Sequence, residues 1–224
     1  MRRIQHQIVL GLLMIIFTVC NNASLCAQTT WTDWIDAIFD VNGTANGTLN
    51  GVEVSYSGQV LSNSDLDGSS NVWNLESSFV GGAVSQSPDE QGDVITLDGG
   101  NTGLQTITFS ETIENPIIAI WSLGRLDEVA TFDFSETPTF QAGGPNSSFG
   151  GNPLEVSGST VSGFEGNGVV LFEGSFDSIS FSSSPEFFYG FTVGTVGAIA
   201  VPEPSSGAIL ILSFLTLSLH RSRE

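Results

Sequence analysis

The stretch TITFSETIENPIIAIWSLGRLDEVATFDF, Thr106 to Phe134, contains three short apolar segments in succession. Thr106–Ser110 and Val129–Phe134 alternate apolar and polar residues, the period of a strand with one buried face. Ile117–Ser122 is nearly all apolar, which predicts a central strand covered on both faces. Asn115-Pro116 precedes it, a position where proline costs no ladder hydrogen bond. The stretch therefore predicts consecutive β-strands.

The same pattern recurs along the chain between turn residues. Asn167-Gly168 and Asp98-Gly99-Gly100 predict tight turns. Ile179 and Phe181 share a face while Phe176 breaks their register, which predicts a bulge. Many short strands favour an all-β fold, a single antiparallel β-sandwich or jelly-roll-like domain. Further strands are expected at Gly51–Ser57, Val94–Leu97, Leu154–Val156, Val169–Glu173, Ser178–Ser182 and Tyr189–Val193.

One N-terminal segment supports two interpretations. Its large apolar residues fall at helical spacing, which fits a short helix capping the sandwich. The β-rich composition of TTWTDW, Thr29 to Trp34, fits an edge strand instead, and we favour the strand. The residues concerned are Trp31, Trp34, Ile35, Ile38 and Phe39.

Residues 1–27 have the pattern of a signal peptide. Arg2 and Arg3 form a basic start, Ile8 to Val19 is an apolar core, and Ala27 is a small residue at a cleavage position. A permanent membrane anchor is the alternative. It is disfavoured because a spanning helix needs about 18 or more apolar residues.

The C-terminal residues 201–224 have the organisation of a second sorting signal. A short motif precedes an apolar run from Gly207 to Leu219, which would form about 20 Å of helix, marginal for crossing a bilayer. Arg221 and Arg223 follow it and are expected to stay cytoplasmic. A helix packed in a core is the alternative, disfavoured by the terminal arginines. The motif residues are Val201, Pro202, Glu203, Pro204 and Ser205.

This tail resembles the PEP-CTERM signal of exported bacterial proteins, with Pro202, Glu203 and Pro204 at its centre. The resemblance implies export by the Sec machinery, transient anchoring in the inner membrane and cleavage by an exosortase-type enzyme. It also implies a Gram-negative host that makes exopolysaccharide, and a final location at the cell surface or outside the cell.

Parts of the body are similar to the β-rich region of other PEP-CTERM proteins. That similarity carries no assigned catalytic residues. The similar segments are residues 42–52, 115–124, 161–168 and 189–194.

Residues 28–200 form the expected β-sandwich domain, and their composition excludes several kinds of chemistry. Both cysteines and both histidines lie in the terminal segments, and the chain has no lysine. Catalysis by Ser-His-Asp or Cys-His groups is therefore excluded, as is an ordinary zinc or copper site. Of the 24 acidic residues, 23 lie between Gln28 and Pro204, against the single base Arg125. Such a body does not bind nucleic acid, which requires many phosphate contacts.

A weak calcium motif lies at Asn63, Asp65 and Asp67, followed by Gly68. Oxygen ligands at alternate positions before a glycine resemble the first half of a calcium loop. Asn74 stands where the bidentate glutamate belongs, so a polar turn is the alternative. No other cofactor is expected.

Aromatic residues could supply a sugar-stacking platform. The residues considered are Trp73, Trp121, Phe187, Phe188 and Tyr189. Trp121 is expected in the core, whereas Trp73 and the segment 185–189 lie near turn-like stretches, and Trp73, Phe188 and Tyr189 are the candidate ligand-binding residues. Arg125 is expected to form a structural ion pair with Asp127 or Glu128, or to bind a sugar or carboxylate.

The sequence leads to three functional expectations. The first is a non-enzymatic surface or matrix protein, associated with exopolysaccharide, whose charge keeps it soluble and engages divalent cations. The second is a carbohydrate-binding module, which needs exposed aromatic residues. The third is a glycoside hydrolase, which needs two nearby carboxylates; the acids considered are Asp133, Glu136, Glu165 and Glu173.

Overall fold

The computed structural model describes residues 28–66, 71–74, 76–88, 93–100, 103–145 and 151–197. The expected signal helix and C-terminal hydrophobic helix both lie outside these residues. Within them, no helix has the length and apolar character needed to cross a bilayer.

The described chain is all-β, which confirms the predicted class. It contains one short 3₁₀ helix, η1 (Glu76–Ser78). Its strands are β1 (Thr30–Trp31), β2 (Asp33–Ile38), β3 (Asp40–Leu49), β4 (Val52–Val60), β5 (Ile95–Leu97), β6 (Gln105–Glu114), β7 (Pro116–Leu123), β8 (Ala130–Phe134), β9 (Thr139–Gly143), β10 (Glu155–Ser157), β11 (Thr160–Gly163), β12 (Gly166–Leu171), β13 (Ser175–Ser183) and β14 (Tyr189–Thr195).

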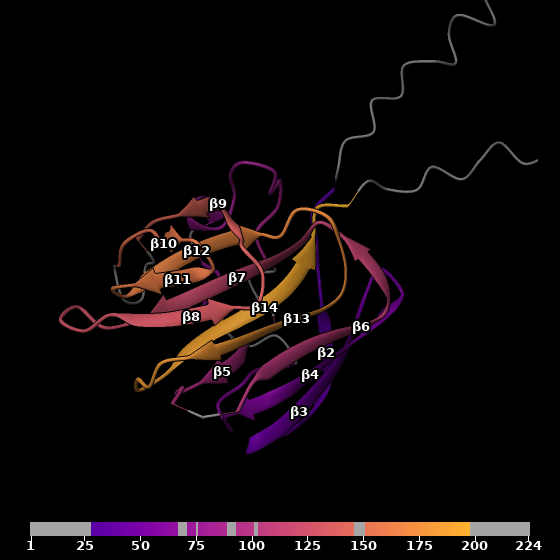
Figure 1. Ribbon diagram of the computed structural model, residues 1–224, viewed down its shortest axis with the longest axis horizontal. Coiled ribbons are helices and arrows are strands. Elements are labelled where there is room, and N and C mark those ends of the chain that lie inside the picture. The colour runs from indigo at the N-terminus through magenta and orange to yellow at the C-terminus, as the bar shows by residue number, and fades with distance from the viewer. Residues whose placement is uncertain are drawn as a thin grey trace, which may run out of the picture. The chain divides into compact units, whose positions relative to one another are not determined.

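The strands form two sheets, and every pairing between named strands is antiparallel (Figure 1). The six-stranded sheet has the order β1-β14-β7-β12-β9, with β5 also paired to β14. The eight-stranded sheet has the order β10-β11-β8-β13-β6-β4-β3-β2. One hydrophobic core contains residues of both sheets, so they pack as a sandwich.

Aromatic rings dominate the core between the sheets. Phe132 and Phe181 of the eight-stranded sheet lie 4.8 Å apart, centroid to centroid. Phe132 also meets Tyr189 of the six-stranded sheet at 5.3 Å. Such pairs add about 0.5–1.5 kcal/mol each to the free energy gained by burying their area.

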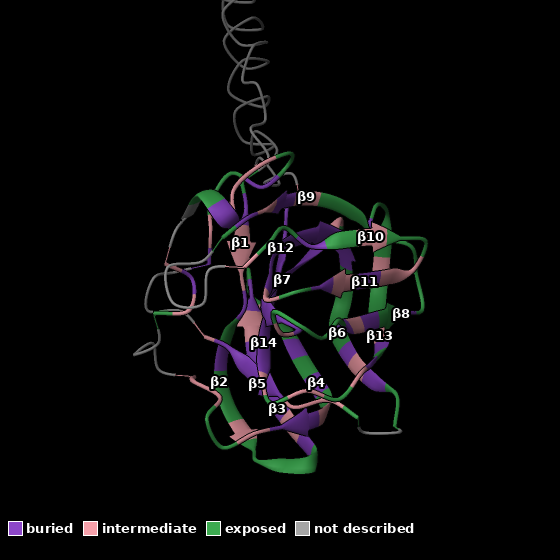
Figure 2. Cartoon of the chain, turned by 90° about the vertical axis from the view of Figure 1, so that its left-hand side faces the viewer, coloured by how far each residue is buried: buried purple, intermediate pink, exposed green. Residues whose placement is uncertain are grey.

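A second core lies on the other face of the six-stranded sheet. Trp121 belongs to it together with Trp73 and Phe79, whose rings meet edge to face at 5.1 Å. Successive residues of β7 enter the two cores in turn: Ile118 and Ile120 belong to the first, and Ala119 and Trp121 to the second. Figure 2 shows buried residues along β7. The prediction of a central strand covered on both faces is confirmed.

Several local predictions are also confirmed. The N-terminal segment forms strands β1 and β2, not a helix. Pro116 begins β7. The register between β13 and β6 shifts between Phe176 and Ser178, the predicted bulge.

The turn predicted at Asn167-Gly168 is wrong, because both residues lie inside β12. Asn167 is completely buried, and its side-chain oxygen accepts the backbone N–H of Ser122 at 2.9 Å. The amide is therefore used to join β12 to the end of β7. A turn that sequence reasoning missed lies at Asn50-Gly51, between β3 and β4, where both residues have positive φ.

The two ends of the described domain lie next to each other. Thr30 of β1 pairs with Thr195 of β14, and Trp31 pairs with Gly194. The first and last described residues therefore leave the six-stranded sheet at the same end (Figure 1).

Candidate functional site

Three loops meet at one end of the sandwich, and we call residues 122–129, 163–167 and 184–188 the loop cluster. These segments join β7 to β8, β11 to β12, and β13 to β14. Antiparallel pairing brings the ends of these strands to the same edge. The cluster is therefore assembled from segments far apart in the sequence.

The backbone of the cluster is held in an unusual conformation. Ser122 and Glu165 have φ of 56° and 51°, values uncommon for residues other than glycine. Ser122 Oγ donates to Glu165 Oε2 at 2.9 Å, and Asn167 Nδ2 donates to the Glu165 carbonyl at 3.0 Å. The first bond joins the first two loops, and the second holds the backbone of the second loop.

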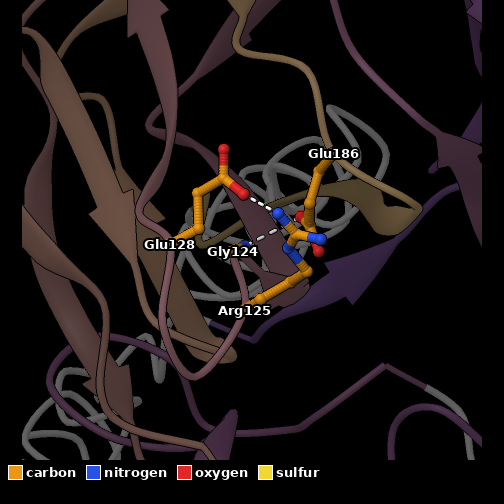
Figure 3. Close-up of polar contacts among 4 residues, drawn as sticks. All are labelled: Gly124, Arg125, Glu128 and Glu186. Atoms are coloured by element: carbon orange, nitrogen blue, oxygen red, sulfur yellow. Dashed lines mark hydrogen bonds and ion pairs between the residues drawn. The ribbon is translucent and has the colours of Figure 1, made fainter.

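Arg125, the only base of the body, lies in the first of the three segments. Its guanidinium forms an ion pair with Glu128, which confirms the predicted structural pair, and lies over the ring of Phe187 with Cζ 4.7 Å from the centroid. The neighbouring Gly124 N–H donates to Glu186 Oε2 at 2.9 Å (Figure 3). The guanidinium is therefore close to both a carboxylate and an aromatic face.

Glu186 is half-buried in this arrangement. Its pKa is raised from 4.5 to about 7, chiefly by burial and also by the nearby Glu165, against the opposing effects of the Gly124 N–H and Arg125. Near neutral pH the side chain therefore exists in both protonated and ionised forms.

The candidate stacking residues have different surroundings from those predicted. Trp73 and Tyr189 are completely buried, so neither offers the exposed ring face that stacking on a sugar requires. Phe188 is partly buried and packs on Trp121 at 5.8 Å. Trp121 is buried, which confirms its expected place in the core. The exposed ring of this segment is Phe187, at 73% exposure, one of the aromatic residues that the sequence offered for a stacking platform.

The calcium motif is described only in part, since Asp67 lies outside the described residues. Asp65 pairs with Val94 through two backbone hydrogen bonds, of 3.0 and 2.8 Å, and the Asn63 carbonyl accepts from Thr96 Oγ1 at 3.5 Å. The described part is thus a turn tied to β5. In the described ranges no group of three or more acidic, histidine or cysteine side chains is placed to hold a metal. Calcium binding at this segment stays a prediction.

A second surface feature is an open groove of about 410 Å³ on the eight-stranded sheet. Its carboxylates are Asp36 and Glu53, and Asn46 Nδ2 donates to Asp36 Oδ1 at 2.8 Å. Its other lining residues include Ile35, Thr48, Ser55, Thr108 and Ser110, and none of its lining residues is aromatic. The groove offers hydrogen bonds but no stacking surface.

The acids considered for hydrolysis are dispersed. Asp133 is exposed and accepts hydrogen bonds from Thr131 of its own strand and from Thr160 of the neighbouring strand. Glu136 and Glu173 are exposed on the surface. Glu165 alone of these acids belongs to the loop cluster, where its charge acts on Glu186. The sorting-motif residues, Val201 to Ser205 with Arg221 and Arg223, lie outside the described residues.

Comparison with known proteins found no matching family model, curated protein or solved structure. The function is therefore argued from the chain itself.

Proposed function

We propose that this is an exported, non-enzymatic protein of the cell surface or extracellular matrix, sorted by its PEP-CTERM-like tail. Its partners are the Sec machinery, an exosortase-type enzyme and exopolysaccharide, and it is anchored in the inner membrane only transiently. The body is a jelly-roll-like sandwich between a signal helix and a C-terminal hydrophobic helix. Carbohydrate binding is the alternative role of the body, and a carboxylate-based hydrolase is a further one.

The observation that carries the proposal is the pairing of the domain's two ends. β1 lies beside the last residues of β14, so both flanking segments are joined to the domain at one end of one sheet. The cores and both sheets are built from residues between Thr30 and Val196. Removal of the two terminal signals therefore takes away none of the strands and core residues that the structure describes. A domain that is released by proteolysis needs this separation.

The surface charge supports the same role. The body carries one base among many acids, and its eight-stranded sheet presents Ser, Thr, Asp and Glu side chains around an open groove. A strongly negative surface keeps a protein dispersed, and it attracts divalent cations that also bind acidic polymers.

The test is fractionation and intact mass of the protein made in its own host. One variant replaces Pro202, Glu203 and Pro204 with alanine. We expect the unaltered protein outside the cell without either terminal signal, and the variant in the membrane with its tail. The matched control replaces Ser213, Thr216 and Ser218 with alanine, which preserves the motif, the apolar run and the arginines. If the unaltered protein and the motif variant both keep the tail in the membrane, the sorting proposal is wrong.

A further inference from the structure

The most exposed aromatic ring described in the structure lies beside the only base of the body. Phe187 is 73% exposed, against 50% for Phe39, 44% for Phe140 and 40% for Phe164. Most of the other described aromatic rings are buried, and Phe187 differs from the other exposed ones in lying beside a cation. The Arg125 guanidinium lies over the ring, and most of the surface of Phe187 is open to solvent.

The polar groups around the Phe187 ring offer both hydrogen-bond donors and acceptors to a ligand. A guanidinium has five N–H donors, of which the Glu128 pair uses only part. The Arg125 Nε is buried and has no hydrogen-bond partner among the described residues. Glu128 has an exposed side chain that can accept bonds, and Glu186 can accept or donate near neutral pH.

We propose that Phe187, Arg125, Glu128 and Glu186 form a binding site for one sugar unit of a neutral polysaccharide. The inference deepens the matrix role proposed above by naming the polymer class and the residues that bind it. The ring stacks on the C–H face of the sugar. Arg125 donates to its hydroxyl oxygens, and the carboxylates accept from its hydroxyl groups. Aromatic contact with a few convergent polar groups is the usual composition of a small-molecule site.

The charge of the cluster selects a neutral polymer over an acidic one. The loop cluster contains the acids Asp127, Glu128, Glu165 and Glu186 against the single base Arg125, which is already paired with Glu128. A polyuronate would bring further carboxylates to an acidic surface on an acidic domain, and like charges repel. A neutral sugar has no such penalty.

The test is native affinity electrophoresis of the full chain, whose formal charge of −19 drives it toward the anode. The gels contain a soluble β-glucan, an α-glucan, a galactomannan or a polyuronate. Any detergent in the gels is zwitterionic, because the sugar headgroups of glucoside detergents would compete with the polymers for the site. We expect at least one neutral polymer to retard the protein and the polyuronate not to do so. Loss of the ring in Phe187→Ala is expected to raise the Kd about tenfold, equivalent to about 1.4 kcal/mol.

Two further variants test whether the effect is specific to the Phe187 ring and to the Arg125 guanidinium. Phe140→Ala removes another exposed ring, from β9, and is expected to leave the Kd within about twofold. Arg125→Lys keeps the charge but loses the planar fork, and is expected to raise the Kd severalfold. If Phe187→Ala proves unfolded by circular dichroism, Phe187→Leu replaces it, since leucine keeps apolar bulk without a flat ring.

Three outcomes would overturn the proposal. They are no retardation by any neutral polymer, equal retardation of the Phe187 variant, and retardation by the polyuronate alone. Binding of a polylysine probe without binding of neutral polymers would instead assign a cationic partner, and would also reject the sugar site. Processing of the tail is measured separately, so the sorting proposal and the sugar site can fail independently.

Discussion

Replacing Glu186 with glutamine should change how stability depends on pH. Glutamine resembles the protonated side chain, and its oxygen can still accept the Gly124 N–H that now binds Glu186 Oε2 at 2.9 Å. The substitution therefore removes the charge while keeping the main polar contact. The variant therefore measures how much folding stability is lost by holding an ionised, half-buried carboxylate beside Glu165.

The sign follows from the direction of the pKa shift. Burial raises the pKa of Glu186 from 4.5 to about 7, so between these pH values the folded protein binds more protons than the unfolded chain. The stabilising contribution of protonation is therefore complete below pH 4.5 and is lost as the pH rises through about 7. A shift of this size corresponds to about 3 kcal/mol. Since Glu186 is only half-buried, solvent screening reduces the expected effect to about 1 kcal/mol.

The assay is thermal unfolding followed by circular dichroism at pH 8 and pH 4.5. At pH 8 we expect the Glu186→Gln variant to melt about 2–4 °C above the unaltered protein. At pH 4.5 the two should coincide, because the carboxyl group is protonated in the folded protein. Glu173→Gln is the control, since it removes one charge from an exposed site. A Tm difference that is equal at both pH values, or a variant that is less stable at pH 8, would refute the reasoning.

Three stability predictions concern other parts of the domain. Gly51→Ala places Cβ in open space at a φ of 84° and should cost about 1–2 kcal/mol. At Gly124, with a φ of 81°, the Cβ added by Gly124→Ala would lie 2.1 Å from a backbone oxygen. Urea titration should therefore show that Gly124→Ala lowers the unfolding free energy by about 2 kcal/mol more than Gly51→Ala does. Phe132→Ala opens the core between the sheets and should lower the unfolding free energy by about 3–5 kcal/mol, whereas Phe140→Ala, at an exposed site, should change it by less than about 0.5 kcal/mol. Gln59→Leu removes the buried side-chain oxygen that accepts two backbone N–H groups of the turn after β5, at 2.9 and 3.0 Å; calorimetry should show a loss of about 2 kcal/mol.

Strands whose inward residues are large could be predicted from sequence. Ile117 to Trp121 alternate between two cores, and the resulting apolar run is visible without a structure. β3 could not be recognised in this way. Its inward positions alternate correctly, but three of the four are small: Gly43, Ala45, Gly47 and Leu49. The strand forms because β2 and β4 pair with it on both sides, so tertiary pairing overrides its low β-propensity.

The candidate site could be predicted only in its local part. Arg125 and Glu128 are three residues apart, so their ion pair follows from the sequence. The bond from Gly124 to Glu186 joins residues 62 positions apart. A sequence rich in acids gives no reason to choose Glu186 over the others. The exposure of each ring could not be predicted from the sequence either. Phe187, Phe188 and Tyr189 are consecutive residues, yet the first ring is exposed, the second partly buried and the third buried. The loop backbone determines which ring meets solvent.

One of the two edges of the eight-stranded sheet links the acidic composition to the fold. β2 is the outermost strand, and its Ile35 and Ile38 are 63% and 65% exposed. An exposed strand with apolar side chains is normally a site of edge-to-edge aggregation. Asp33 and Asp36 lie on the same strand, so a second copy that paired here would bring its own aspartates against them. The charge therefore opposes self-association at the edge where the side chains would favour it, as the proposed role among polysaccharide chains requires.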